Sequence, residues 1–322
     1  MKILVTGGAG YIGSHMVKRL MEEGHDIVVL DDLSAGHKNS LYDHCLVVGQ
    51  VEDIELVSGL LSSGDFDAIF HFSGSTSVSE SVLNPAKYFI NNFCASLALL
   101  GVAVKFNVKN FIFSSTAAIY GAPRYTPVDE FHPEDPINAY GESKLMFERA
   151  LKYFEAAYGI RYVSLRYFNA AGADPSGGLG ERHEPETHLI PLALRATQPG
   201  NQLTVYGADY NTIDGTCVRD YIHVTDLCEA HSLALGHLIR GGGSRTYNLG
   251  NGEGYSVFEI IKAIEKVTGV AVNVKHGARR QGDPDRLIAD SSKIRAELGW
   301  QPKYGLTQII KHAWAWERSL CQ

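Results

Sequence analysis

Cysteine, positive charge and long apolar runs are all scarce in this chain of 322 residues. The five cysteines are odd in number and show no C-x-x-C spacing. This pattern favours reduced thiols in a cytoplasmic protein over a disulfide framework or a cysteine zinc site, and we predict no metal site. The cysteines are Cys45, Cys94, Cys217, Cys228 and Cys321.

The charge and the hydropathy pattern argue against two kinds of partner. The chain has 29 Lys and Arg against 36 Asp and Glu, a net charge of −7, and no basic stripe that would suit nucleic acid. No uninterrupted apolar run reaches the ~20 residues of a membrane span, and the first predicted strand already begins at Lys2. We therefore predict that neither nucleic acid nor a membrane is a partner.

Glycine, in contrast, is abundant, and four glycines directly follow the first apolar run. Lys2–Val5 reads as a buried strand, Gly7, Gly8, Gly10 and Gly13 follow, and His15–Met21 then has helical spacing. Glycine lets backbone N–H groups approach a phosphate, and a helix N-terminus adds partial positive charge. The G-x-x-G-x-x-G spacing differs from the commoner G-x-G-x-x-G and is a weak signal alone.

An acidic residue strengthens this nucleotide-binding interpretation. The next apolar run, Ile27–Leu30, ends at Asp31, which lies 18 residues after Gly13. That is close to the ~20 residues expected for a carboxylate that binds an adenosine ribose, and it favours NAD over NADP. The alternative is an ordinary strand–helix–strand unit with a surface Asp.

Strands alternate with helices along the first half of the chain, which predicts an α/β, Rossmann-type, doubly wound parallel sheet. Residues 1–170 form the predicted NAD-binding domain, with a return segment near 220–236, and residues 171–322 form a smaller α+β lobe. Further strands are predicted at 46–49, 68–72, 110–115, 163–167, 203–206, 246–250 and 270–274, and helices at 85–104, 140–158, 257–268 and 291–298.

Ligands of such sheets bind beyond the carboxyl ends of the strands. That rule gathers Gly7–Gly13, Asp31, Phe72–Gly74, Ser114–Thr116 and Phe168–Asn169 around one predicted site.

Tyr140 and Lys144 are separated by four residues at a predicted helix start that Asn138 can cap. Side chains at i and i+4 share a helix face with Cβ atoms ~5–6 Å apart. The ammonium is expected to lower the pKa of the phenol from ~10, which would give a general base. Thr116 can bond a substrate oxygen and relay its proton. The alternatives are a chance Tyr-x-x-x-Lys match and a Thr116 hydroxyl that only caps backbone.

Seven motifs, spread over nearly the whole chain, resemble those of the extended short-chain dehydrogenase/reductase family, and in particular its NAD-dependent 4-epimerases of UDP-hexoses. The most specific are LRYFNAAGADPSG (165–177) and DGTCVRDYIHV (214–224). The others lie at 6–13, 107–121, 140–148, 247–252 and 289–300.

The resemblance implies that the C4 hydride of a UDP-hexose passes to bound NAD and returns to the other face of the sugar. It implies that Tyr140, Lys144 and Thr116 are catalytic. It assigns NAD contacts to Gly7, Gly10, Tyr11, Ile12, Gly13, Asp31, Gln50, Val51, Phe72, Ser73, Gly74, Asn92, Thr116, Tyr140, Lys144 and Phe168. It assigns substrate contacts to Thr116, Tyr140, Asn169, Leu189 (by its backbone), Arg219, Arg280, Asp283 and Leu287.

Three positions depart from the family pattern: Gln50 replaces a common Asp, Thr76 a common Lys, and Thr116 a common Ser. A surface ion pair is the alternative interpretation for Arg219 and Arg280.

The resemblance also implies a homodimer through helices 85–104 and 140–158. At Leu287 many relatives confined to glucose and galactose have Tyr, so the smaller Leu predicts room for N-acetyl sugars.

The same motifs bear on related chemistries. A 4,6-dehydratase needs a carboxylate pair, but Ala117 and Ala118 follow Thr116 and the next acid is Asp129. An epimerase of uronates or pentoses and a non-catalytic NAD-sensing protein stay open.

Overall fold

The computed structural model describes residues 1–41, 45–280 and 283–320, so Cys321 lies outside the described residues. The chain forms two compact units. The first contains Met1–Gly121, Pro133–Arg166 and Cys228–Tyr247, and the second contains Ala122–His132, Tyr167–Leu227 and Asn248–Gln322. Segment 122–132 thus belongs to the second unit, and the segment that returns to the first unit begins at Cys228.

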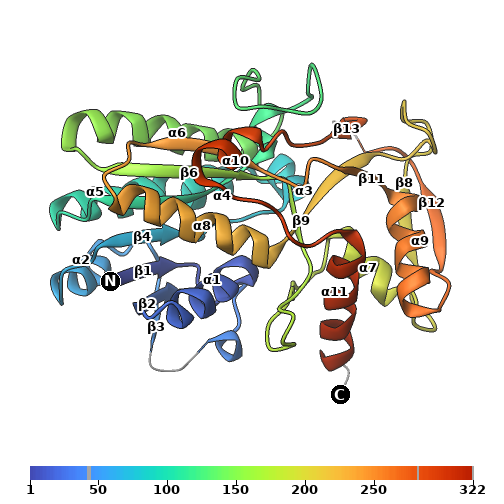
Figure 1. The fold of residues 1–322 in the computed structure, drawn as a ribbon, viewed down its shortest axis with the longest axis horizontal. Helices are drawn as coiled ribbons and strands as arrows, with labels where there is room; N and C mark the ends of the chain where they lie inside the picture. Colours follow the sequence, from blue (N-terminus) through green and yellow to red (C-terminus); the bar gives the residue numbers. More distant parts are fainter. Residues whose placement is uncertain (42–44, 281–282, 321–322) are drawn as a thin grey trace. The chain divides into compact units, whose positions relative to one another are not determined.

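A seven-stranded sheet of order β10-β6-β5-β4-β1-β2-β3 organises the first unit (Figure 1). The pairs β1–β2, β1–β4, β4–β5 and β2–β3 are parallel, which confirms the predicted Rossmann-type sheet. The strands are β1 (Lys2–Thr6), β2 (Asp26–Asp31), β3 (Leu46–Val48), β4 (Ala68–His71), β5 (Asn110–Thr116), β6 (Arg161–Tyr167) and β10 (Arg245–Leu249).

Strand β10 corrects the sequence analysis, which assigned residues 246–250 to the smaller lobe. It follows α8 (Val224–Ile239), which carries the chain back to the first unit, and it forms the edge of the large sheet beside β6. The five-residue strand has no sequence signal for its sheet, because its partner β6 lies far away in the sequence.

Helices of the first unit agree with the predicted alternation, with one irregularity. They are α1 (Tyr11–Glu22), α2 (Ile54–Ser62), α3 (Val78–Leu83), α4 (Pro85–Tyr88), α5 (Ala95–Lys105), α6 (Ala139–Tyr158) and most of α8, with 3₁₀ turns at Lys38–Ser40 and Ala117–Tyr120. The predicted helix 85–104 is interrupted by a π-helical segment, Phe89–Cys94, a feature frequent at functional sites.

By length and composition alone, the helical stretch Pro85–Lys105 could cross a membrane, although Lys87, Asn91 and Asn92 interrupt its apolar residues. A core helix of a globular protein passes it as well. Leu99 and Leu100 of this stretch are fully buried in the core of the first unit, which accounts for its apolar composition.

The core beneath α5 and α6 shows why the strands read as continuous apolar runs. Leu4, Ile69 and Phe111 project from neighbouring strands and belong to one buried cluster with Leu100 and Phe147 of the helices. The alternate residues of a strand, such as Val5 after Leu4 in β1, point to the opposite face of the sheet and are also fully buried. Each such side chain contributes roughly 1.5–3 kcal/mol of transfer free energy.

In its described residues, the second unit consists of short strands and helices around its own core. The strands are β7 (Asn169–Ala171), β8 (Leu203–Tyr206), β9 (Val218–His223), β11 (Gly254–Ser256), β12 (Val274–Gly277) and β13 (Arg286–Leu287). Strand β9 lies between β11 and β13 and also pairs with β7, while β8 pairs with β12. The helices are α7 (Leu189–Arg195), α9 (Val257–Thr268), α10 (Ser292–Leu298) and α11 (Leu306–Leu320).

The predicted strand 270–274 is wrong in its bounds, since β12 begins only at Val274. Thr268 explains the shift, because its hydroxyl bonds the backbone of Val270 and holds the chain in a turn after α9.

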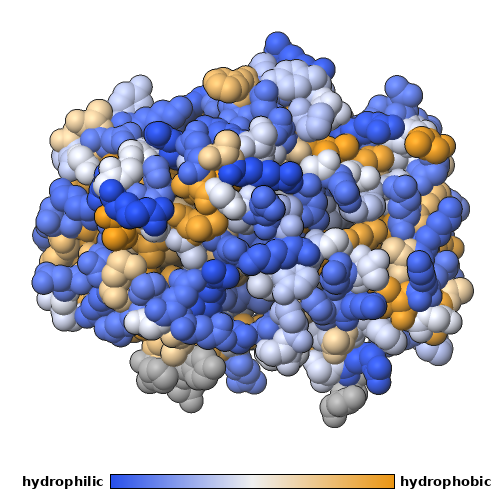
Figure 2. All heavy atoms as spheres, viewed as in Figure 1, coloured by the Kyte–Doolittle hydropathy of each residue, from blue (hydrophilic) through white to orange (hydrophobic). Residues whose placement is uncertain are grey.

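Polar and charged residues cover most of the surface that faces the viewer in Figure 2.

Candidate active site

The glycine turn after β1 is too tightly packed for any larger residue. Gly7 has φ +70°, and a Cβ built on it would lie 2.5 Å from the amide nitrogen of Ser73. A Cβ on Gly13 would lie 2.1 Å from the Gly7 carbonyl oxygen. Helix α1 starts at Tyr11 with Gly10 as its N-cap, so its first N–H groups are reached without a capping side chain. This cradle fits a dinucleotide pyrophosphate.

Asp31 ends β2 and is nearly fully buried. Its two carboxylate oxygens accept hydrogen bonds of 2.9 Å from the backbone N–H groups of Ala9 and Leu33. Burial raises the pKa of this carboxyl, and the two backbone bonds oppose the shift. The bonds fix the side chain beside the glycine turn and leave lone pairs for ribose hydroxyl groups.

Asn92 and Lys144 come together at Gly74. A Cβ on Gly74 would lie 3.0 Å from Asn92 Oδ1 and 3.4 Å from Lys144 Nζ. Asn92 Oδ1 accepts a 2.8 Å bond from the Ser75 N–H, and its amide nitrogen donates to the Ser75 carbonyl at 2.9 Å. The π-helical segment thus holds the loop after β4, and both elements contain residues predicted to contact NAD.

Thr116, Tyr140 and Lys144 are assembled by β5 and the first turn of α6. Asn138 caps α6 through a 2.8 Å bond from the Gly141 N–H to its Oδ1, which confirms the predicted cap. Thr116 forms a side-chain hydrogen bond with Tyr140 and also accepts a 3.1 Å bond from the Ala118 N–H. Its hydroxyl therefore both caps the backbone and contacts the phenol.

Lys144 is buried at 2 % exposure and donates a 3.1 Å bond to the Ser114 carbonyl. Its ammonium also lies 5.0 Å from the centroid of the Phe113 ring. Burial lowers the pKa of Lys144 to about 8. Burial, and then the charge of Lys144, lower the pKa of His71 to about 3, so this histidine is neutral between Thr6 and Ser96.

The predicted direction of the Tyr140 shift is wrong for the protein groups alone. Desolvation raises the pKa of this phenol, and the hydrogen bond from Thr116 opposes the rise. The sequence argument counted only the charge of Lys144 and omitted the cost of burying a phenolate.

Glu148 is a site residue that the sequence analysis missed. It follows Lys144 by one helical turn on α6 and accepts a 2.5 Å bond from Ser115, the neighbour of Thr116. Arg166 of β6 pairs with the same carboxylate at 2.6 Å. The sequence did contain a sign of it: Glu148 follows Lys144 by four residues, just as Lys144 follows Tyr140. This spacing places all three side chains on one face of α6.

In the second unit, β9 gathers several predicted substrate contacts. Arg219 pairs with Asp283 at 3.3 Å and donates a 2.8 Å bond to the Pro284 carbonyl. Leu287 is the β13 register partner of Arg219. Asn169 of β7 donates a 2.8 Å bond to the Asp220 carbonyl of β9. The ion pair expected as the alternative for Arg219 therefore exists, and its guanidinium side chain is only 13 % exposed.

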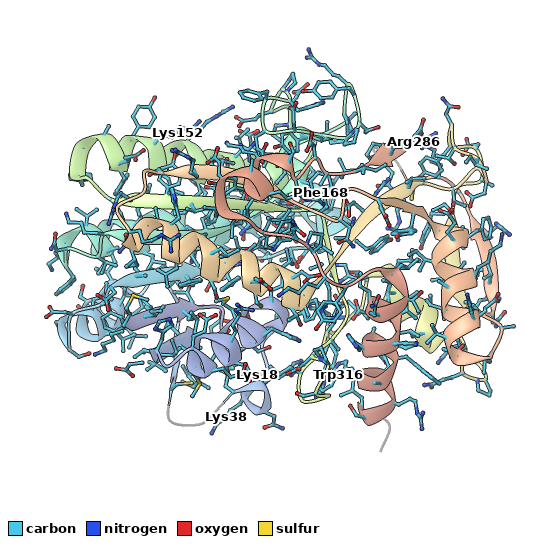
Figure 3. The ribbon with its side chains drawn as sticks, in the orientation of Figure 1. Lys18, Lys38, Lys152, Phe168, Arg286 and Trp316 are labelled. Carbon is cyan, nitrogen blue, oxygen red and sulfur yellow. The ribbon has the colours of Figure 1, made fainter. Side chains whose placement is uncertain are left out.

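The other predicted contacts are dispersed. The Arg280 guanidinium lies 4.2 Å from the centroid of the Tyr206 ring, and Leu189 is the first residue of α7. Phe168 is buried, whereas Arg286 is exposed; Figure 3 labels both residues. Gln50 and Thr76 are exposed, whereas Val51 is buried.

The parallel sheet and its glycine cradle define a dinucleotide-binding protein of the Rossmann class. The model of the NAD dependent epimerase/dehydratase family matches residues 3–250, and the chain belongs to this family.

Individual relatives are similar over almost their full lengths. A UDP-glucose 4-epimerase of Halalkalibacterium halodurans is 47% identical, covering 99% of this chain and 96% of the relative. The crystal structure of UDP-glucose 4-epimerase from Brucella ovis in complex with NAD is 46% identical, with a TM-score of 0.94 and 97% of each chain covered. The UDP-Glc/GlcNAc 4-epimerase of Campylobacter jejuni is 43% identical, with a TM-score of 0.86 and 99% of each chain covered.

Proposed function

We propose that this chain is an isomerase that interconverts UDP-glucose and UDP-galactose by epimerisation at C4, with NAD as its cofactor. The observation that most directly supports this activity is the grouping of Thr116, Tyr140 and Lys144 at the end of β5. The group lies beside the Gly74 loop of the same unit. The family match and the relatives named UDP-glucose 4-epimerase support the same activity.

NAD, when bound, supplies the group that takes the C4 hydride and gives it back. Gly7, Gly10 and Gly13 would let the pyrophosphate approach α1, and Asp31 would accept from the adenosine ribose. Asn92 and Lys144 flank Gly74, where Lys144 can donate to a second ribose. We expect these contacts to keep NAD bound throughout the catalytic cycle.

Tyr140 is the proposed general base for the sugar 4-hydroxyl. Because burial raises the pKa of Tyr140, the phenol keeps its proton in the protein alone. A positive charge beside the phenol is required to favour the phenolate. Lys144 lies one helical turn further along α6, and Thr116 donates to the phenol oxygen. On return of the hydride, Tyr140 gives its proton back to the O4 atom.

Arg219, Arg280, Asp283, Asn169 and Leu189 are proposed to bind the UDP moiety. An arginine fork gives two parallel donors for a diphosphate oxygen pair. Arg219 is already oriented by Asp283 and Pro284, which lowers the entropy that binding would cost.

The smaller Leu287 supports a proposal on substrate range: N-acetylhexosamine pairs are also turned over. Leu287 is partly exposed and stands beside Arg219 in the β9–β13 register. Uronate and pentose substrates stay the alternative.

We also propose a cytoplasmic homodimer that binds neither nucleic acid nor membrane. Val82, Leu83 and Ile90 are more than half exposed along α3 and the π-helical segment, and Tyr153 is 77 % exposed on α6. Exposed apolar side chains on these elements suit burial against a second copy. Light scattering should give twice the mass of 35.2 kDa, and a monomer at micromolar concentration would contradict this proposal.

The activity is tested by NMR with UDP-galactose and no added cofactor. The wild-type protein should produce UDP-glucose, and Tyr140→Phe should lose roughly 10²–10⁴-fold in turnover while still binding UDP. A Tyr140→Phe protein with near-native turnover would remove the proposed base. UDP binding without turnover by the wild type would favour a non-catalytic NAD-sensing protein.

A further inference from the structure

Two histidines and two glutamates converge in the loop that precedes α7. Nδ1 of His183 lies 3.4 Å from Glu181 Oε1 and 3.7 Å from Glu186 Oε2. Nδ1 of His188 lies 2.6 Å from Glu181 Oε1 and 3.4 Å from Glu186 Oε1. The four ligand atoms all lie within 4.8 Å of one another.

These separations match a tetrahedral metal site. Bonds of ~2.0–2.2 Å from Zn²⁺ to nitrogen and oxygen place neighbouring ligand atoms about 3.3–3.6 Å apart. Three of the four measured pairs are within about 0.2 Å of that range, with the two Glu186 distances measured to different carboxylate oxygens, and the short His188–Glu181 pair needs to open by less than 1 Å. Imidazole and carboxylate together suit first-row divalent ions such as Zn²⁺.

Glu186 gives an independent indication that a ligand is required. Its side chain is 1 % exposed. Oε1 accepts hydrogen bonds from the N–H groups of Thr187 and His188, at 2.7 and 2.9 Å. Oε2 is buried and accepts no hydrogen bond from the described residues; its neighbour in the cluster is Nδ1 of His183, at the ion-pair distance of 3.7 Å. Burying a carboxylate oxygen without a donor is costly, and a cation would remove that cost.

The loop is fixed on α11 rather than held by the cluster alone. Trp316, labelled in Figure 3, donates a 2.9 Å bond to the Glu181 carbonyl. A Cβ on Gly180 would lie 2.2 Å from the Trp316 ring, so the loop backbone packs directly on the indole. A preorganised backbone favours a metal site because less order has to be created on binding.

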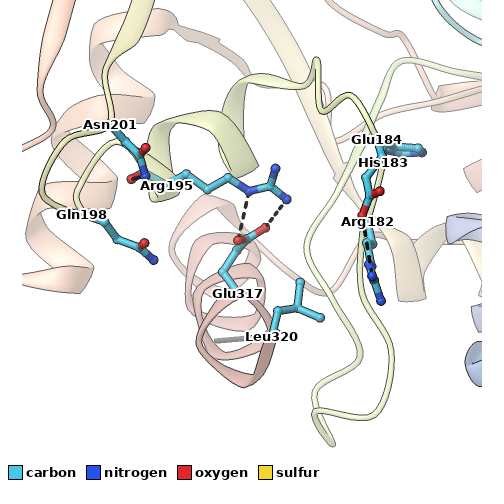
Figure 4. Close-up of a pocket in the computed structure, with 8 residues that line it drawn as sticks. All are labelled: Arg182, His183, Glu184, Arg195, Gln198, Asn201, Glu317 and Leu320. Carbon is cyan, nitrogen blue, oxygen red and sulfur yellow. Dashed lines mark hydrogen bonds and ion pairs between the residues drawn. The ribbon is translucent and has the colours of Figure 1, made fainter. Parts of the chain in front are cut away.

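A cavity of about 320 Å³ adjoins the cluster and gives an ion a route to it (Figure 4). His183 lines this cavity, together with Arg195 and Glu317. Two arginines that line the cavity would oppose a metal, but the guanidinium of Arg195 pairs with Glu317 at 3.2 Å and that of Arg182 pairs with Glu184 at 3.6 Å. The dashed lines between Arg195 and Glu317 in Figure 4 mark the first of these pairs. The opposing charge is therefore largely compensated.

We propose that Glu181, His183, Glu186 and His188 form a binding site for one divalent transition-metal ion of the Zn²⁺ class. The ion would cross-link both ends of segment 181–188 and fix the start of α7. The site is structural, and its readout needs no catalysis. Cysteine spacing gives no sign of it, because its ligands are His and Glu, two to seven residues apart.

The test is zinc binding by tag-free protein after extraction with a chelator. Wild-type protein should retain one zinc per chain after dialysis, measured by mass spectrometry of the metal. Co²⁺ in its place should give the visible d–d absorption of a tetrahedral site. Glu186→Gln keeps an oxygen that can accept from Thr187 and His188 but loses the anionic ligand. Its zinc affinity should fall at least about 100-fold, since losing only an outer-shell partner costs 10–100-fold.

Glu184→Gln is the matched control, because Glu184 lies in the same loop, is exposed, and is outside the four-residue set. It should bind zinc like the wild type. Should Glu186→Gln not fold, His183→Asn takes its place, with the unfolding temperature as the fold check. Less than one zinc per chain in the wild type, an octahedral cobalt spectrum, or equal affinity in Glu186→Gln would overturn the proposal and leave an ion-pair cluster only.

Discussion

Gly141→Ala should separate the catalytic groups without altering any of them. Gly141 lies between Tyr140 and the end of β5, and a Cβ built on it would lie only 2.5 Å from the carbonyl oxygen of Ala118. The carbonyl is backbone, so no side chain can rotate away. The close approach of α6 to the turn after Thr116 therefore depends on glycine at this position.

The magnitude follows from the required displacement. A comfortable contact needs about 3.2–3.4 Å, so the first turn of α6 or the 117–120 turn must move by roughly 0.7–0.9 Å. A misplacement near 1 Å costs up to about 10²-fold in rate. Overpacking costs typically ~1–3 kcal/mol in stability. We expect kcat to fall about 10–100-fold, with the KM for UDP-galactose within about 3-fold of wild type because the residues proposed to bind the UDP moiety belong to other elements.

The assay is steady-state conversion of UDP-galactose, with urea unfolding in parallel. Gly59→Ala is the control, because Gly59 lies in α2 and a Cβ built on it would have no heavy atom within 4 Å. It should keep full activity and gain up to about 1 kcal/mol from helix propensity. A Gly141→Ala protein with wild-type kcat would refute the idea that this approach positions Tyr140 and Thr116.

Three further predictions concern cofactor, charge and substrate range. NAD should co-purify in near-stoichiometric amount, released on denaturation; stoichiometric NADP would contradict the role of Asp31. Burial lowers the pKa of Lys144 to about 8, so its charged form is less stable in the folded protein, and this penalty is complete below pH 8 and vanishes as pH rises to 10.5. Lys144→Met should therefore lose activity. In nucleotide-free protein at pH 7 its free energy of unfolding should exceed that of the wild type by about 2 kcal/mol, once the lost hydrogen bond to Ser114 is subtracted, and this gain should shrink by pH 10.5. A stability difference that stays constant across pH would contradict the assignment. Leu287→Tyr should reduce turnover of UDP-N-acetylglucosamine selectively; equal losses on both sugar pairs would show that Leu287 does not gate the pocket.

The parts of the fold that the sequence predicted are those with local signals. The buried run Lys2–Thr6, the glycine turn and the Asn138 cap each combine a periodicity with a specific backbone requirement, and the structure has them where expected. Strand β10 was assigned to the wrong sheet because strand pairing is non-local. Five residues of ordinary β character carry no information about which sheet receives them.

The candidate site divides in the same way. Tyr140 and Lys144 were found from their spacing, but the direction of the Tyr140 pKa shift depends on how much protein surrounds the phenol, which spacing does not report. Glu148 was missed because its partners, Ser115 and Arg166, come from two different strands. The Glu and His cluster before α7 became visible only once the loop backbone was known.

Epimerisation of UDP-galactose in D₂O tests the central claim most directly. If the C4 hydrogen leaves the sugar as a hydride and returns from bound NAD, the UDP-glucose formed should carry protium at C4, while Tyr140→Phe gives almost no product. The proton NMR signal of that position reports the result. Deuterium at C4 of the product, or no conversion by the wild-type protein, would contradict the account.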